Sequence, residues 1–123
     1  MATRSTQVQR VARFRELLAR DALAVMPCCF DGLSAKLIER AGFEVIFMTG
    51  FGVSAVHGVP DTQLLSFGEL VHSAATICES LRDVPCIGDA ETGYGNAMNV
   101  KRTLAAYAQA DMAGIMLEDQ VSL

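Results

Sequence analysis

The composition of this chain of 123 residues, 51% hydrophobic and 20% charged, is that of a folded globular domain and excludes an intrinsically disordered one. A net charge of −4 argues against a nucleic-acid-binding surface, which is normally basic. No uninterrupted apolar stretch is long enough to cross a membrane. Neither nucleic acid nor a lipid bilayer is therefore an expected partner.

The arginine-rich N-terminus leaves two interpretations open. Four arginines precede the first acid, Glu16, a pattern loosely typical of an organelle transit peptide. Val8, Val11 and Phe14 in the same stretch recur with helical spacing, which predicts an ordinary amphipathic first helix. We favour the helix and a cytoplasmic location, and organelle targeting stays open.

The cysteines predict no reactive or metal-binding site. They occupy positions 28, 29, 78 and 86, without the C-x-x-C spacing of a zinc or redox site. No secretory signal pattern precedes them, which fits reduced thiols. Because unreactive cysteine behaves as a small buried hydrophobe, we expect all four to be structural and none to be catalytic.

Strand-like apolar runs alternate with helix-like segments along the rest of the chain. The predicted strands are residues 22–30, 43–48, 84–88 and 113–117. The predicted helices that separate them are residues 34–41, 66–81 and 99–110. These strands are apolar on both faces, as strands are in parallel sheets that helices cover. The sequence therefore predicts an α/β fold built from parallel strand–helix units.

Local signals support two of the helix starts. Ser34 lies near the N-cap of the helix over 34–41, and Ser66 and Glu69 have the spacing of a capping box. Residues 53–67 have little periodicity, so we expect a long loop there with at most one helical turn.

Polar residues follow each predicted strand at the point where it ends. They are Asp31, then Thr49 and Gly50, then Asp89 and Glu91, and finally Glu118 and Asp119. In parallel α/β folds the ligand binds outside the carboxyl ends of the strands. We therefore expect these residues to lie along one rim.

The segment 88–96, GDAETGYGN, is the strongest candidate for a site. Residues 89 and 91 project to the same face of an extended strand end, so Asp89 and Glu91 can converge on a divalent cation such as Mg²⁺. The alternative is that Asp89 caps a turn while Glu91 is solvated. A dinucleotide-binding fingerprint is excluded, because Met98 occupies the position of its third glycine.

Three other side chains have weaker patterns. Tyr94 lies between two glycines of the same segment, and its ring and hydroxyl suit it to line a pocket. His57 lies in the predicted loop, where it either faces the site or is solvated. We expect His72, on the helix over 66–81, to lie at or near the surface.

Five blocks in order between residues 12 and 121 resemble the isocitrate lyase and phosphoenolpyruvate mutase superfamily. They are residues 30–35 (FDGLSA), 48–54 (MTGFGVS), 60–61 (PD), 89–96 (DAETGYGN) and 117–120 (LEDQ). They are most similar to the branch with methylisocitrate lyases, oxaloacetate-cleaving enzymes and carboxyvinyl-carboxyphosphonate phosphorylmutase. The resemblance implies that residues 1–123 are one partial domain, the N-terminal half of a (β/α)₈ TIM barrel with a preceding helix.

The resemblance also implies a function. Members use Mg²⁺ or Mn²⁺ to cleave a C–C or P–C bond of a small 2-hydroxy or 2-oxo carboxylate through an enolate-like intermediate. The implied metal residues are Asp89 and Glu91, with Asp61 as a further acid and Glu118 in the water shell of the metal. Those implied for the substrate are Thr49, Gly50 and Phe51, beside the pocket candidate Tyr94.

The chain departs from the family pattern in two ways. Glu91 stands where the family has a second aspartate, which moves the carboxylate outward by about one C–C bond. The lysine–cysteine–glycine–histidine loop that follows E-D-Q in lyases, and supplies their acid/base cysteine, does not occur before Leu123. The catalytic acid/base is therefore unassigned.

Two hypotheses follow. The chain is a fragment of a lyase-family enzyme, inactive alone, or it is a non-catalytic half-barrel that acts as an interaction module. In both cases we expect a homo-oligomer or a completing half-barrel as partner, because an open parallel sheet leaves unpaired edges.

Overall fold

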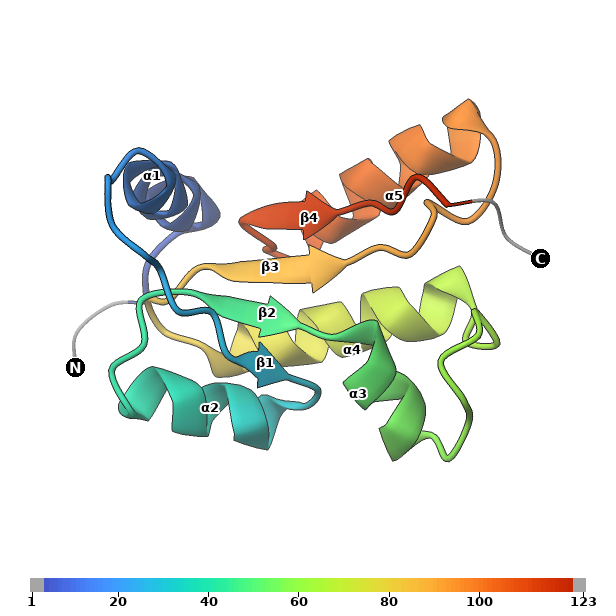
Figure 1. Ribbon diagram of the computed structural model, residues 1–123, viewed down its shortest axis with the longest axis horizontal. Helices are drawn as coiled ribbons and strands as arrows, with labels where there is room; N and C mark the ends of the chain where they lie inside the picture. The colour runs from blue at the N-terminus through green and yellow to red at the C-terminus, as the bar shows by residue number, and fades with distance from the viewer. Residues whose placement is uncertain (1–3, 121–123) are drawn as a thin grey trace.

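The computed structural model describes residues 4–120 as a four-stranded parallel sheet with five helices. The strands are β1 (Cys28–Cys29), β2 (Ile46–Met48), β3 (Cys86–Asp89) and β4 (Gly114–Met116), and their order in the sheet follows their order in the chain. All neighbouring pairs are parallel, so the strand arrows point the same way in Figure 1. The predicted parallel strand–helix arrangement is confirmed, and the loops after the strands lie at one end.

The helices are α1 (Gln7–Leu18), α2 (Gly32–Arg40), α3 (Gly50–Val56), α4 (Phe67–Ser80) and α5 (Ala97–Gln109). α2 packs against α4, and α4 packs against α5. α1 lies near the amino ends of the strands, away from the arrowheads, whereas α3 lies beyond the arrowhead of β2 (Figure 1). None of the helices in residues 4–120 is long and apolar enough to span a membrane.

Two groups of buried side chains hold the sheet to its helices. The larger group lies between the sheet and the helices and includes Ile46, Met48, Leu70, Ile77 and Tyr107. The smaller group contains Leu17, Val45 and Ile87, with Phe14 of α1 packed against it. Burying each large apolar side chain contributes about 1.5–3 kcal/mol to folding relative to leaving it exposed.

Polar contacts connect α1 to the amino ends of the strands. Arg10 is only 1% exposed, and its Nη2 lies 2.8 Å from Asp111 Oδ2. Arg4 contacts the same carboxylate oxygen at 3.1 Å, and Gln7 donates to the carbonyl oxygen of Met112 at 3.1 Å. These contacts anchor the N-terminal helix to the connection between α5 and β4.

The predicted first strand is wrong over most of its length. Only Cys28 and Cys29 pair with a neighbour, and Leu23 and Val25 are 93% and 58% exposed. The reason is that β1 lies at an edge of the sheet, where residues before the pairing region have nothing to pack against. Cys28 is also exposed, unlike Cys29, Cys78 and Cys86, so the expectation of burial fails at this one cysteine.

Two helix predictions also need correction. α2 begins earlier than expected because Asp31, not Ser34, is its N-cap: the Asp31 carboxylate accepts from the Ser34 amide at 2.7 Å. α3, whose N-cap is Thr49, begins before the predicted loop over residues 53–67 and overlaps it at residues 53–56, where one helical turn was allowed. Two glycines in α3 weaken its helical signal, and burial of Val53 stabilises it instead. The capping box that begins α4 is confirmed.

Candidate metal-binding and substrate-binding site

Asp89 is the last residue of β3, and three hydrogen bonds fix it in place. Its Oδ2 accepts from the Gly50 amide at 3.0 Å, and its Oδ1 accepts from the Glu91 amide at 3.0 Å. Its carbonyl oxygen accepts from the Tyr107 hydroxyl at 2.6 Å. The carboxylate is therefore held at the boundary between β3, the start of α3 and the following turn.

The Glu91 carboxylate lies beside that of Asp89, but the backbone that places it there is not the predicted extended strand. The strand ends at Asp89, and Glu91 has a φ of +50°, so alternation along an extended strand does not align the two side chains. The carboxylates converge all the same. A Cβ atom at Gly50 would lie 2.9 Å from both Asp89 Oδ2 and Glu91 Oε1. The turn, rather than the strand, brings them together.

Backbone contacts hold this turn against β4. The Glu91 carbonyl accepts from the Glu118 amide at 2.9 Å, and the Ala90 amide donates to the Met116 carbonyl at 3.0 Å. Gly93 closes the turn by donating to the Ala90 carbonyl at 2.9 Å. The segment after β4 thus lies beside the carboxylates.

The site carries uncompensated negative charge. Glu91 is 9% exposed, and this burial, followed by the charges of Asp89, Asp61 and Glu118, raises its pKa to about 7. Asp61 and Glu118 are themselves exposed. A bound cation would offset this repulsion, because it favours the ionised form of each carboxyl group.

The donor set fits a hard cation that uses few protein ligands. Within residues 4–120, no three histidine, cysteine, aspartate or glutamate side chains are placed to hold one metal ion together. The carboxylates of Asp89 and Glu91 lie close together, whereas Asp61 and Glu118 do not join them in one group of metal ligands. Mg²⁺ commonly binds through one or two carboxylates and takes its other ligands from water and substrate.

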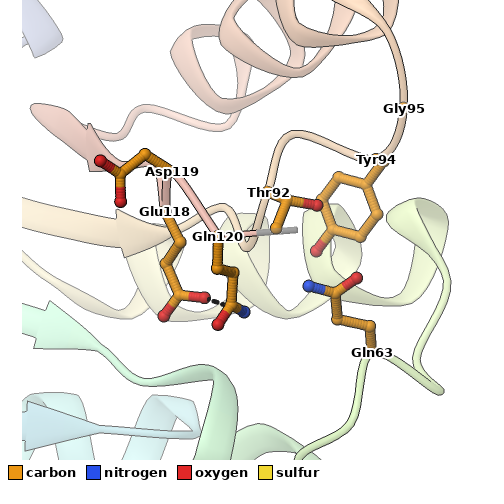
Figure 2. A pocket seen from close by; sticks show the side chains of 7 residues that line it. All are labelled: Gln63, Thr92, Tyr94, Gly95, Glu118, Asp119 and Gln120. Atoms are coloured by element: carbon orange, nitrogen blue, oxygen red, sulfur yellow. Dashed lines mark hydrogen bonds between the residues drawn. The ribbon is translucent and has the colours of Figure 1, made fainter. Parts of the chain in front are cut away.

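A pocket of about 520 Å³ opens between the turn after Glu91 and the segment after β4, and neither Asp89 nor Glu91 lines it. It is lined by Gln63, Thr92, Tyr94, Gly95, Glu118, Asp119 and Gln120. Figure 2 shows Gln63 and Tyr94 on one side and Glu118 and Gln120 on the other, with the Asp119 carboxylate turned away from Gln63. Gln120 donates to Glu118 Oε2 at 2.6 Å, which orients that carboxylate. Tyr94 thus forms part of the wall of this pocket.

None of the other three substrate candidates lines this pocket, although the Gly50 amide contacts the Asp89 carboxylate. The Thr49 amide donates to the Cys29 carbonyl at 3.0 Å and the Gly50 amide donates to Asp89, so both donors already have partners. Thr49 and Phe51 line a separate apolar pocket of about 500 Å³. The structure therefore does not bring them into the pocket that Tyr94 lines.

The two histidines lie outside this pocket. His57 is exposed, and its Nδ1 lies 2.9 Å from the Val53 carbonyl oxygen within α3. His72 is exposed on α4, as expected.

Sequence reasoning missed the part that α5 plays in the site. Tyr107 and Thr103 are buried, and each donates a hydrogen bond to the loop that carries the carboxylates. Their spacing of four residues places them on one helix face, but the sequence does not show which element that face contacts. Gln63 and Thr92 were missed because no local pattern marks them.

Comparisons with known proteins agree with the resemblance. Residues 14–122 match the family model of phosphoenolpyruvate phosphomutase. The chain is 49% identical over 111 residues to 2,3-dimethylmalate lyase of Eubacterium barkeri, and it is 40% identical over 109 residues to the chloroplastic carboxyvinyl-carboxyphosphonate phosphorylmutase of Arabidopsis thaliana. These matches cover 89% and 88% of this chain but 38% and 32% of the relatives.

Among solved structures, phosphonopyruvate hydrolase in complex with oxalate and Mg²⁺ superposes with a TM-score of 0.87 at 32% identity. The match covers 95% of this chain and 40% of the hydrolase chain. The chain thus spans well under half the length of these relatives. Its four parallel strand–helix units accordingly form about half of a (β/α)₈ barrel. The chain belongs to the phosphoenolpyruvate phosphomutase family, within the isocitrate lyase and phosphoenolpyruvate mutase superfamily.

Proposed function

We propose that this chain supplies the metal-binding half of a Mg²⁺-dependent enzyme that cleaves a C–C or P–C bond of a small 2-hydroxy or 2-oxo carboxylate. The observation that carries the proposal is the convergence of Asp89 Oδ2 and Glu91 Oε1 over Gly50 at the carboxyl end of the sheet. The names of the relatives support the reaction class, since they include a lyase, a phosphorylmutase and a hydrolase.

The residues of this chain would prepare the site for the cation and the substrate. Mg²⁺, when bound, supplies positive charge that stabilises the negative oxygen of an enolate-like intermediate. Asp89 is oriented for it by two amides, and Glu91 joins it once its carboxyl group has lost its proton. Tyr94 gives the pocket an apolar wall. Asp61 and Glu118 add negative charge that favours a cation.

A second candidate function is association with a completing half-barrel or with a second copy. Within residues 4–120, β1 and β4 each have a strand partner on one side only. Phe30 and Met116 beside these edges are 41% and 42% exposed. Such edges and apolar side chains favour association. Residues 1–123 would then be one partial domain of a larger assembly.

We further propose a cytoplasmic location. All four cysteines are free thiols, which fits a reducing compartment. Organelle targeting by the arginine-rich N-terminus is the alternative, and fractionation of cells would test it.

Calorimetric titration with MgCl₂ tests the metal site. We expect Asp89→Asn to abolish binding, because the isosteric amide removes the charge and keeps an acceptor for only one of the two amides that Asp89 binds. Glu91→Asp should bind as well as or better than the parent chain, because it restores the shorter carboxylate of the family pattern. Glu79→Gln, an exposed substitution on α4, is the control. Unchanged binding in Asp89→Asn would refute the site.

Activity requires a separate assay on the protein that carries this chain. Cleavage of 2,3-dimethylmalate, oxaloacetate or phosphonopyruvate that depends on added Mg²⁺ would support the enzyme. Mg²⁺ binding without any turnover would favour the interaction module.

A further inference from the structure

Helix α5 holds the loop of the site through two hydroxyl groups on one of its faces. Tyr107 donates to the Asp89 carbonyl at 2.6 Å, and Thr103 donates to the Gly93 carbonyl at 3.1 Å. Residues four apart on a helix lie on the same face, so both hydroxyls point toward the loop. The two carbonyls that they bind lie on either side of Glu91.

Both donor side chains are shielded from water, and packing reinforces the hydrogen bonds. Tyr107 is 0% and Thr103 is 1% exposed. The ring of Tyr107 lies so close to Gly88 that a Cβ there would be 2.6 Å from its Cε1 atom. Val100 packs in the same way against Gly93, where a Cβ would be 2.6 Å from the Cγ2 atom of Val100. Helix α5 therefore contacts the loop closely at both ends.

The loop needs such support because its backbone is unusual. Glu91 has a φ of +50° and Tyr94 a φ of +63°, in a left-handed region that residues other than glycine rarely adopt. Conformations of this kind persist only where the surrounding structure holds them, and they cluster at functional sites. The position of the Glu91 carboxylate depends directly on this backbone.

We propose that Tyr107 and Thr103 are positioning residues that hold the 89–94 loop so that Asp89 and Glu91 converge on a divalent cation. The cation itself rests on the proposed function, whereas the restraint on the loop does not. Thr103 Oγ1 also lies 3.0 Å from the Asn99 carbonyl, so its hydrogen bond to Gly93 is shared within the helix. Tyr107 therefore carries the larger part of the effect.

Three variants and one control test the proposal. Tyr107→Phe and Thr103→Val each remove a hydroxyl with little change in volume, and Thr103→Ser keeps the hydroxyl. Ile77→Val, at a fully buried position of α4, is the control for a modest loss of stability in the core. Mn²⁺ affinity is measured by calorimetry. Hydrogen exchange of the Gly50 and Glu91 amides, which donate to the Asp89 carboxylate, is followed by NMR without metal.

We expect Tyr107→Phe to weaken Mn²⁺ binding about 10- to 100-fold, as is typical when a group that orients a metal ligand is lost. Thr103→Val should act in the same direction with a smaller effect. Both should speed exchange of the two amides, while Thr103→Ser and Ile77→Val should resemble the parent chain.

The outcomes separate the two proposals. If Tyr107→Phe and Thr103→Val match Ile77→Val in both measurements, the positioning role is wrong. If the parent chain binds no Mn²⁺, the proposed function fails, and the exchange rates alone decide the positioning role. If Tyr107→Phe does not fold, the contrast between Thr103→Val and Thr103→Ser decides it.

Discussion

Gly50 and Asp89 are joined across neighbouring strand ends by the 3.0 Å hydrogen bond from the Gly50 amide to Asp89 Oδ2. The contact leaves no room for a side chain at Gly50, because a Cβ atom there would meet both site carboxylates at 2.9 Å. Gly50 thus sets how closely Asp89 and Glu91 approach each other.

Gly50→Ala should therefore weaken divalent-cation binding about 10-fold or more while the chain still folds. The atoms that a methyl group would strike are the ends of side chains, which can swing aside, and this separates the carboxylates. Gly68→Ala in α4 is the control, because its Cβ would meet only Ser66 Oγ at 3.9 Å. Gly68→Ala should stabilise helix α4 by about 0.5–1 kcal/mol. Calorimetry and thermal melts distinguish the two effects, and equal Mg²⁺ affinity in both variants would contradict the prediction.

Glu91 should make the metal-free chain less stable as pH rises. Below its ordinary pKa of 4.5 both folded and unfolded chains keep the proton. Between 4.5 and about 7 the unfolded chain loses it first, so the free energy of unfolding falls with pH. Glu91→Gln should therefore raise the melting temperature at pH 8 more than at pH 4.5. Glu16→Gln on α1 is the surface control. An increase in the melting temperature of Glu91→Gln that does not depend on pH would argue against the shifted pKa of Glu91.

The same group predicts how binding of Mg²⁺ depends on pH. Because the cation requires the ionised carboxylate, its affinity should fall as pH drops through about 7. In Glu91→Asp the carboxylate is shorter and less crowded, so the affinity for Mg²⁺ should fall only at a lower pH. Titrations between pH 5.5 and pH 8.5, values chosen to bracket about 7, would test it, and a flat profile would be inconsistent with a role for Glu91.

Asp111→Asn should destabilise the fold by about 1–3 kcal/mol without changing metal affinity. Arg10 is buried, and loss of the charged partner leaves its guanidinium uncompensated, although Asp111 is partly exposed to water. Asparagine tolerates the φ of +69° at this position, so backbone strain is not the cause. Glu44→Gln breaks the half-exposed pair with Arg20 and should cost at most about 1 kcal/mol. Urea denaturation measures both, and equal losses would show that burial of Arg10 is not decisive.

The isolated chain of 123 residues should self-associate. Its two sheet edges and exposed apolar residues such as Leu23 and Val25 favour contacts between copies. Sedimentation analysis at increasing concentration would detect the oligomers. A compact monomer that melts cooperatively would contradict this expectation.

The repeating pattern of the fold was predictable from the sequence, because buried parallel strands produce continuous apolar runs and helices show capping signals. Ser66 and Glu69 identified the start of α4 correctly. The first strand was overextended because an edge position, which is a property of the whole sheet, decides whether Leu23 has anything to pack against. The start of helix α3 at Gly50 was missed because its stability comes from tertiary burial rather than from helix propensity.

The site was only partly predictable for a related reason. Asp89 and Glu91 stand out in the sequence, but the turn that brings them together depends on left-handed backbone at Glu91, which no propensity predicts. Tyr107 could not be connected with Asp89 from local patterns, because that contact joins residues on different elements. The separation of Thr49 from the pocket of Tyr94 is likewise a three-dimensional fact.

The polar contacts of α1 with the connection between α5 and β4 affect the order in which the molecule folds. Arg4 and Arg10 both contact Asp111, so the first helix can complete its contacts only after that residue has left the ribosome. At about 5–20 residues per second, the wait from residue 10 to residue 111 is about 5–20 s. During that interval the contacts of α1 with the connection between α5 and β4 are not yet formed, so the final docking of this helix is a late step of folding.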